Sequence, residues 1–190
     1  MTRRLRSEKC PRCHLPPVLC LCEALTPIAV PVRIIVVMHS KEAARPSNSG
    51  HLLPFLLEGA SVVHRGEAEG SGDLPPYEAP AAVLFPADAA RALQPDDPLR
   101  TLFVPDGNWR QARRIAQREP ALASARRVCL PAGGPPLARL RGHPEADHLA
   151  TLEAVARALG ALGHTAAQAH LEAIWLRFAA AIERLRLGGI

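Results

Sequence analysis

The stretch that decides the fold is Leu102-Phe-Val-Pro-Asp-Gly-Asn-Trp-Arg-Gln-Ala-Arg-Arg-Ile115. Its first three residues form a short apolar run that suits a strand covered on both faces, and Pro105 and Gly107 favour a turn after it. A helix is then expected from about Asn108, because apolar residues recur at helical spacing while arginines fall on another face. The pattern predicts a strand, a turn that holds Asp106, and a basic helix.

Asp106 is the candidate functional residue of this stretch. A carboxylate at the carboxyl end of a parallel strand, beside a helix N-terminus and several arginines, lies where open α/β sheets bind ligands. A structural interpretation competes with this one. Asp106 or Asn108 would cap the helix, and Trp109 would be a core residue. The stretch alone leaves both interpretations open.

The rest of the chain predicts an α/β fold with a mostly parallel sheet and helices on both faces. Short apolar or β-branched runs predict strands at residues 32–38, 61–64, 81–85, 100–104 and 126–130. Apolar residues at helical spacing predict helices at residues 49–58, 151–163 and 165–187, with a helical turn or two at residues 89–93. Residues 131–144 form a Gly/Pro-rich loop, long enough to suggest that it binds something.

Composition bounds the function. A hydrophobic content of 48% over 190 residues is enough for one sizeable domain with a full core. A net charge of +5 favours a polyanionic partner. No apolar run is long enough for a membrane span, and no signal core is present, so a cytoplasmic protein is expected. The GxGxxG, Walker and HExxH motifs are absent, which removes the evidence for a Rossmann methyltransferase, an NTPase or a zinc protease.

Four of the five cysteines lie close together near the N-terminus, at Cys10, Cys13, Cys20 and Cys22. In a reducing compartment such a cluster is typical of a zinc site, because thiolates hold Zn²⁺ tetrahedrally. A site closed by four cysteines has no open position, so the zinc is expected to be structural. His14 could replace one cysteine, and a redox-sensitive leader is the alternative. We expect residues 1–27 to be the zinc-binding segment and residues 28–190 the main domain.

The motifs resemble those of one family. Asp106-Gly-Asn-Trp109 resembles the signature of the DTW-domain family, which includes the tRNA-uridine aminocarboxypropyltransferases and is similar to the SPOUT-type RNA-modifying enzymes. Three further motifs follow the family's order: the four cysteines, Arg45-Pro-Ser-Asn-Ser-Gly50, and Arg139-Leu-Arg141 with Ala150-Thr-Leu-Glu-Ala154. Two positions depart from the family pattern, since Asn108 replaces a threonine and Ala150 replaces a serine. No role is carried over to this chain for those two hydroxyls.

The resemblance implies a fold, a reaction and a set of site residues. It implies a SPOUT-like domain with a knotted C-terminal half, S-adenosylmethionine as co-substrate, and tRNA as the partner of a monomer or homodimer. The catalytic residues it implies are Asp106, as general base, and Trp109. The residues it implies for the donor are Phe85, Pro86, Pro105, Leu130, Arg141, Leu149, Thr151 and Glu153. The residues expected to bind RNA, with the basic ones holding its phosphates, are Lys41, Arg45, Ser47, Asn48, Arg110, Arg113 and Arg114.

The expected reaction follows from the chemistry of the donor. S-adenosylmethionine has three electrophilic carbons, and the one held in line with the nucleophile reacts. In the family the 3-amino-3-carboxypropyl arm moves to N3 of a uridine, which needs a base to remove the N3 proton. Two alternatives remain. One is a transferase of the same family, or a methyltransferase, acting on ribosomal RNA. The other is a non-catalytic zinc-ribbon protein that binds RNA.

Overall fold

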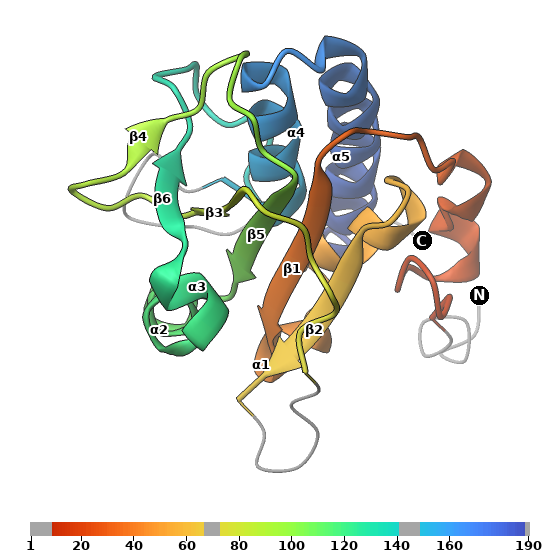
Figure 1. Cartoon of the computed structure of the whole chain (residues 1–190). Coiled ribbons are helices and arrows are strands. Elements are labelled where there is room, and N and C mark those ends of the chain that lie inside the picture. The colour runs from red at the N-terminus through yellow and green to blue at the C-terminus, as the bar shows by residue number, and fades with distance from the viewer. Residues whose placement is uncertain (1–8, 67–72, 141–148, 189–190) are drawn as a thin grey trace.

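The computed structural model describes residues 9–66, 73–140 and 149–188. These residues form one six-stranded sheet in the order β2-β1-β5-β3-β6-β4, and every neighbouring pair in it is parallel (Figure 1). The strands are β1 (Arg33–His39), β2 (Ser61–Arg65), β3 (Ala81–Leu84), β4 (Arg91–Ala92), β5 (Thr101–Asp106) and β6 (Arg126–Cys129). The predicted parallel α/β sheet is confirmed.

Helices cover both faces of the sheet, as predicted. Along β1, Ile34, Val36 and Met38 point into the larger core, which contains α4 (Thr151–Ala161) and α5 (Thr165–Arg186). The alternate residues Ile35 and Val37 point into a smaller core under α2 (Trp109–Arg118) and α3 (Pro120–Ser124). Successive side chains of a strand point to opposite faces, so a continuous apolar run fills both cores. Figure 1 shows the two helix pairs on opposite sides of the sheet.

The helix predicted at residues 49–58 is shorter than expected and of the 3₁₀ type, and the helical turn predicted at residues 89–93 is wrong. Residues 49–58 contain a short 3₁₀ helix, η4 (Gly50–Phe55), because Pro54 has no N–H and cannot continue an α-helical ladder. Residues 89–93 contain the edge strand β4 instead of a helical turn, and Leu93 N–H donates to the carbonyl of Cys129 just beyond the paired residues. A short segment that finds a free strand edge satisfies its backbone groups there.

The central strand is longer than predicted. The expected strand ended at Val104, yet β5 continues through Pro105 to Asp106, which pair with Val37 and Met38 of β1. Pairing with β3 has already ended at Phe103. Beyond that point β5 has only one neighbour, and a residue without an N–H is tolerated. The longer strand carries Asp106 to the carboxyl edge of the sheet.

The cysteine-bearing segment packs on the main core. It contains two 3₁₀ turns, η2 (Pro17–Leu19) and η3 (Cys22–Ala24). Leu15, Leu21 and Leu25 are buried in the same core as α4 and α5. The boundary at residue 27 and the knot of the C-terminal half stay predictions. None of the helices in the described part of the chain is long and apolar enough to cross a membrane.

Candidate active site

The carboxyl edge of the sheet holds a pocket of about 620 Å³. It is lined by the segments that follow three strands, namely Phe85 and Pro86 after β3, Pro105 and Asp106 at the end of β5, and Leu130 after β6. The start of α4, residues 138–140 and Trp175 of α5 complete the walls. This edge is where open parallel sheets bind their ligands, and the volume suits a small molecule.

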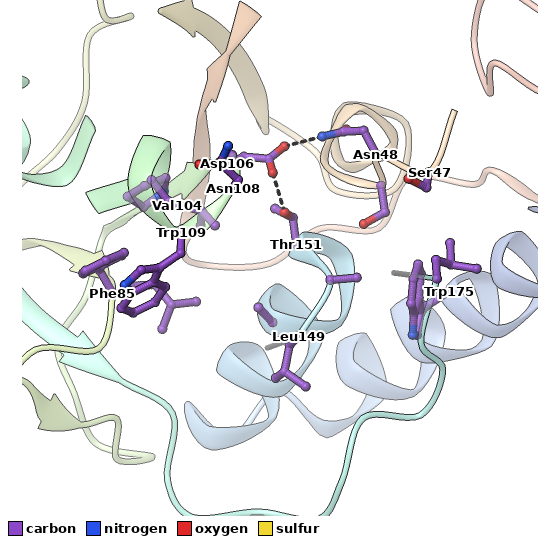
Figure 2. A pocket seen from close by; sticks show the side chains of 18 of the residues that line it. Ser47, Asn48, Phe85, Val104, Asp106, Asn108, Trp109, Leu149, Thr151 and Trp175 are labelled. Atoms are coloured by element: carbon purple, nitrogen blue, oxygen red, sulfur yellow. Dashed lines mark hydrogen bonds between the residues drawn. The ribbon is translucent and has the colours of Figure 1, made fainter. Parts of the chain in front are cut away.

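Asp106 lines the pocket and is 5% exposed. Its Oδ2 accepts a hydrogen bond of 2.7 Å from Nδ2 of Asn48, and its Oδ1 accepts one of 2.8 Å from Oγ1 of Thr151 (Figure 2). Bonds to an ionised acceptor are among the stronger hydrogen bonds of proteins. Two donors from distant parts of the chain therefore fix the direction of both carboxylate oxygens.

Asn48 has only one orientation that satisfies its neighbours. Its Oδ1 accepts from the backbone N–H of His51 at 3.3 Å, so the NH₂ group of the same amide must face Asp106. Asn48 is 3% exposed. The RNA contact predicted for Asn48 stays a prediction, and in the structure this side chain is buried and engaged at both ends. Asn48 holds the carboxylate in place.

Gly50 allows the close approach of the 3₁₀ helix to Asp106. A Cβ at this position would lie 2.6 Å from Oδ2 of Asp106, which is far inside ordinary contact distance. The neighbouring Ser49 accepts a hydrogen bond of 3.1 Å from the N–H of Leu152 in α4. The motif Arg45-Pro-Ser-Asn-Ser-Gly50 therefore packs directly against Asp106 and against the start of α4.

The capping alternative is resolved by Asn108. Its Oδ1 accepts from the N–H of Gln111 at 2.9 Å, and Oε1 of Gln111 accepts from the N–H of Asn108 at 2.8 Å, which forms a complete capping box at the start of α2. The residue that departs from the family pattern thus performs the capping role, while the carboxylate of Asp106 accepts from Asn48 and Thr151 in the pocket wall.

Trp109 is not a core residue. It is 40% exposed and borders the pocket, where its ring stacks on that of Phe85 with centroids 4.8 Å apart and planes 23° apart. Figure 2 shows this pair at one end of the pocket and Trp175 at the other. An exposed indole stacked on a buried ring, beside a buried carboxylate, offers a flat surface to a planar base.

The remaining predicted donor residues divide into three groups. Those that line the pocket, besides Asp106 and Trp109, are Phe85, Pro86, Pro105, Leu130, Leu149 and Thr151. Glu153 does not line it; this residue is fully buried and bonded to Leu137 and Arg157. Arg141 lies outside the described residues.

The predicted RNA-binding residues also take different places. Arg45 and Ser47 border the pocket, and Arg45 forms an ion pair of 3.0 Å with Glu42. Lys41 is exposed on the short helix α1 (Ser40–Ala43). Three of the arginines of α2 were predicted to bind RNA and are exposed on the side of that helix away from its buried residues, namely Arg110, Arg113 and Arg114. The first of these arginines, Arg110, lies two residues after Asn108, which lines the pocket.

The four predicted metal ligands converge. All four sulfur atoms lie within 4.8 Å of one another, with 3.3 Å between Cys10 and Cys22 and 3.7 Å between Cys13 and Cys20. A tetrahedral zinc site with bonds of about 2.3 Å places its sulfurs about 3.8 Å apart. The four thiols therefore fit a zinc ion.

The thiols of the cluster differ in acidity. The backbone N–H groups of Cys13 and Arg12 point at the Cys10 sulfur and lower the pKa of that thiol to about 6. Burial raises the pKa of the Cys13 and Cys22 thiols, and the neighbouring sulfurs act in the same direction on Cys22. Such thiols become thiolates when a metal ion supplies positive charge.

A pair of histidines joins the cysteine segment to the pocket. The rings of His14 and His51 stack with centroids 4.1 Å apart and planes 8° apart. Burial, with a smaller effect from His14, lowers the pKa of His51 to about 4, so this imidazole is neutral at pH 7. The backbone N–H of His51 is the group that orients Asn48. The segment thus supports the residue that holds Asp106.

Sequence reasoning missed one pocket residue on the last helix. Trp175 was expected in the core or at a dimer interface, yet it also lines the pocket. Its indole N–H has no hydrogen-bond partner among the residues that the structure describes. Apolar spacing on α5 gives no sign of this, because a tryptophan that faces a core and one that borders a pocket occupy the same positions of the pattern.

Comparison with known proteins agrees with this geometry. A model of the DTW domain family matches residues 7–183. The chain is 33% identical over 169 residues to tRNA-uridine aminocarboxypropyltransferase 2 of Drosophila melanogaster, an alignment that covers 83% of this chain and 67% of that protein. No solved structure matches significantly. The pocket, the cysteine cluster and these matches together show that the chain belongs to the DTW-domain family.

Proposed function

We propose that this protein transfers the 3-amino-3-carboxypropyl group of S-adenosylmethionine to N3 of a uridine in tRNA and releases methylthioadenosine. The Drosophila relative is a tRNA-uridine aminocarboxypropyltransferase. The observation that carries the proposal is Asp106, a buried carboxylate held by two donors at the edge of a ligand-sized pocket. A carboxylate fixed in this way is suited to accept a proton from a bound base.

The pocket supports the choice of donor. Its lining combines an aromatic pair at one end with apolar side chains from the ends of three strands, which suits a nucleoside. When bound, S-adenosylmethionine supplies an electrophilic carbon next to a positively charged sulfur. Leu130, Leu149 and the backbone around Phe85 would contact its adenosine, and these residues exclude water from the reacting atoms.

Asp106 would act on the acceptor uridine. The N3 proton of uracil passes to a carboxylate oxygen of Asp106, and the freed nitrogen pair attacks the donor carbon. The carbon–sulfur bond breaks and its electron pair stays on sulfur, so the departing product is neutral. Asn48 and Thr151 keep the carboxylate aimed during this step. A uridine in a single-stranded loop would stack on Trp109.

The exposed arginines of α2 would position the RNA. The first of them, Arg110, lies two residues after Asn108, which lines the pocket, and Arg113 and Arg114 follow on the same helix. Guanidinium groups pair well with phosphate. Such contacts fix the orientation of the RNA and carry little sequence information. Arg45, at the rim itself, would contact the phosphate nearest the modified nucleotide.

We also propose that the four cysteines hold a structural zinc ion. A site with four protein sulfurs has no position left for substrate, so the ion would stabilise the segment and take no part in transfer. The stacking of His14 on His51 would connect the zinc-bound segment to η4, where the N–H of His51 donates to Asn48.

The test is Asp106→Asn, which keeps the shape of the side chain and removes the base. We expect kcat to fall by about 10²–10⁴, the usual effect of a lost general base, while methylthioadenosine still binds. Nucleoside mass spectrometry of tRNA and analysis of the donor product complete the experiment. Release of S-adenosylhomocysteine would show methyl transfer instead. Unchanged behaviour of the variant, with no modified uridine, would support a non-catalytic RNA-binding protein.

A further inference from the structure

One wall of the pocket is built from a segment without regular structure. Residues 131–140 contain no helix or strand, yet Ala138, Arg139 and Leu140 line the pocket. A loop wall can define a binding site only if its backbone is held in place. The anchor of this backbone therefore matters for the ligand that it encloses.

A pair of charged side chains on α4 anchors residues 134–137, and Arg186 of α5 donates to the carbonyl of Leu140 further along the loop. Oε1 of Glu153 accepts from the backbone N–H of Leu137 at 2.8 Å and from Nη2 of Arg157 at 2.8 Å. The guanidinium of Arg157 in turn donates to the carbonyls of Gly134 at 2.7 Å and Pro135 at 2.5 Å. The pair thus binds one backbone donor and two backbone acceptors within four residues of loop.

The pair is not a surface salt bridge. The side chain of Glu153 is fully buried and that of Arg157 is 18% exposed, so solvent screens their interaction weakly. The same helix begins with Thr151, which binds Asp106. Helix α4 therefore positions the Asp106 carboxylate through Thr151, and it positions the loop through Glu153 and Arg157.

We propose that Glu153 and Arg157 are positioning residues, which fix residues 134–137 and thereby place the wall 138–140 against the bound donor. Neither side chain lines the pocket, so each acts through the loop. The proposal rests on the proposed function for the identity of the ligand alone. It assigns Glu153 a role different from the direct donor contact that family resemblance implied.

The experiment compares Glu153→Ala and Arg157→Ala with Arg177→Ala, which removes an exposed arginine of α5 that does not line the pocket. Trypsin cleavage after Arg139, followed by mass spectrometry, measures how well the loop is held. We expect cleavage to accelerate by about tenfold to a hundredfold in the two α4 variants, because each loses charge-assisted hydrogen bonds to the loop. The control should be cleaved like the unmodified protein.

Ligand affinity gives the second readout. The dissociation constant of methylthioadenosine and the KM for S-adenosylmethionine should rise together by about tenfold or more, while kcat at saturating donor falls much less. Glu153→Gln keeps an oxygen for Leu137, and Arg157→Lys keeps the charge but not the fork, so both should lie between the alanine variants and the unmodified protein. These milder variants decide the matter if Glu153→Ala does not fold.

Two results would overturn the proposal. One is loss of thermal stability in the α4 variants with unchanged cleavage after Arg139 and unchanged affinity, since that pattern describes a merely structural pair. The other is equal loss in kcat and kcat/KM without a change in affinity. If the unmodified protein binds no methylthioadenosine, the proposed function fails, and the cleavage rates still decide whether the pair holds the loop.

Discussion

A methyl group at Gly50 tests how strictly the position of Asp106 sets the rate. The φ of Gly50 is outside the left-handed region, so the backbone accepts alanine, and the consequences come from the side chain alone. The new Cβ would lie 2.6 Å from Oδ2 of Asp106 and 3.2 Å from Cε of Met38. The flexible end of Met38 can move aside, whereas the carboxylate is held by Asn48 and Thr151.

The size of the effect follows from those distances. To restore ordinary contact, the carboxylate must move by about 0.8 Å, which stretches or breaks its 2.7 Å bond to Asn48. Loss of one hydrogen bond to a charged group costs about 2 kcal/mol, or about 4–8 °C in Tm for a chain of this size. A displacement of this order at a reacting group costs about 10²-fold in kcat.

The assay is methylthioadenosine release with a transcribed tRNA, together with thermal unfolding of the same samples. Val62→Ala is the matched control, because it trims a half-buried side chain of the edge strand β2 far from the pocket and costs on the order of 1 kcal/mol. The control should lose stability and keep its kcat. A Gly50→Ala variant that turns over like the unmodified protein would refute the argument that the placement of Asp106 limits the reaction.

Three further predictions concern the helix, the RNA and the metal. Ala150→Ser should raise the free energy of unfolding by about 1 kcal/mol in denaturant titration, because a serine at this uncapped N-cap would accept from a first-turn N–H; an unchanged midpoint would contradict it. Replacing Arg110, Arg113 and Arg114 together by alanine should weaken tRNA binding. The slope of log K against log salt concentration should fall by the equivalent of about three phosphate contacts, and the affinity for methylthioadenosine, as the control, should not change. Removal of zinc by a strong chelator, or the substitution Cys22→Ser, should lower Tm, and readdition of Zn²⁺ should restore it in the unmodified protein alone. A Tm that does not respond to the chelator would remove the zinc proposal.

The strands of the sheet were predictable because burial on both faces leaves a strong local signal. The run through Ile34 to Met38 feeds two cores at once, so it contains almost no polar residue. The failures occurred where local pattern and tertiary context disagree. Pro54 turned an apolar helical pattern into a 3₁₀ helix, and β4 formed because a sheet edge was available to it.

The site was predictable in its residues more than in its contacts. Asp106 could be proposed from its place after a strand, and its lining neighbours came from family resemblance. Its partnership with Asn48 spans 58 residues of sequence, so no local pattern encodes it. The same applies to Arg157. Its i,i+4 spacing to Glu153 is visible in the sequence, but its hydrogen bond to the carbonyl of Pro135, 22 residues away, is not.

The bonds around Asp106 connect three parts of the chain that are remote in sequence, the loop before η4, the end of β5 and the first turn of α4. A substitution of Asp106 that removes activity therefore also threatens the fold. An apolar side chain here would lose the hydrogen bonds that hold these three parts of the chain together. A family member that lost its activity but remained folded should carry a side chain here that still hydrogen-bonds to both partners. Asparagine meets this condition, because its oxygen can accept from Asn48 and its NH₂ group can donate to Oγ1 of Thr151, a hydroxyl that also accepts.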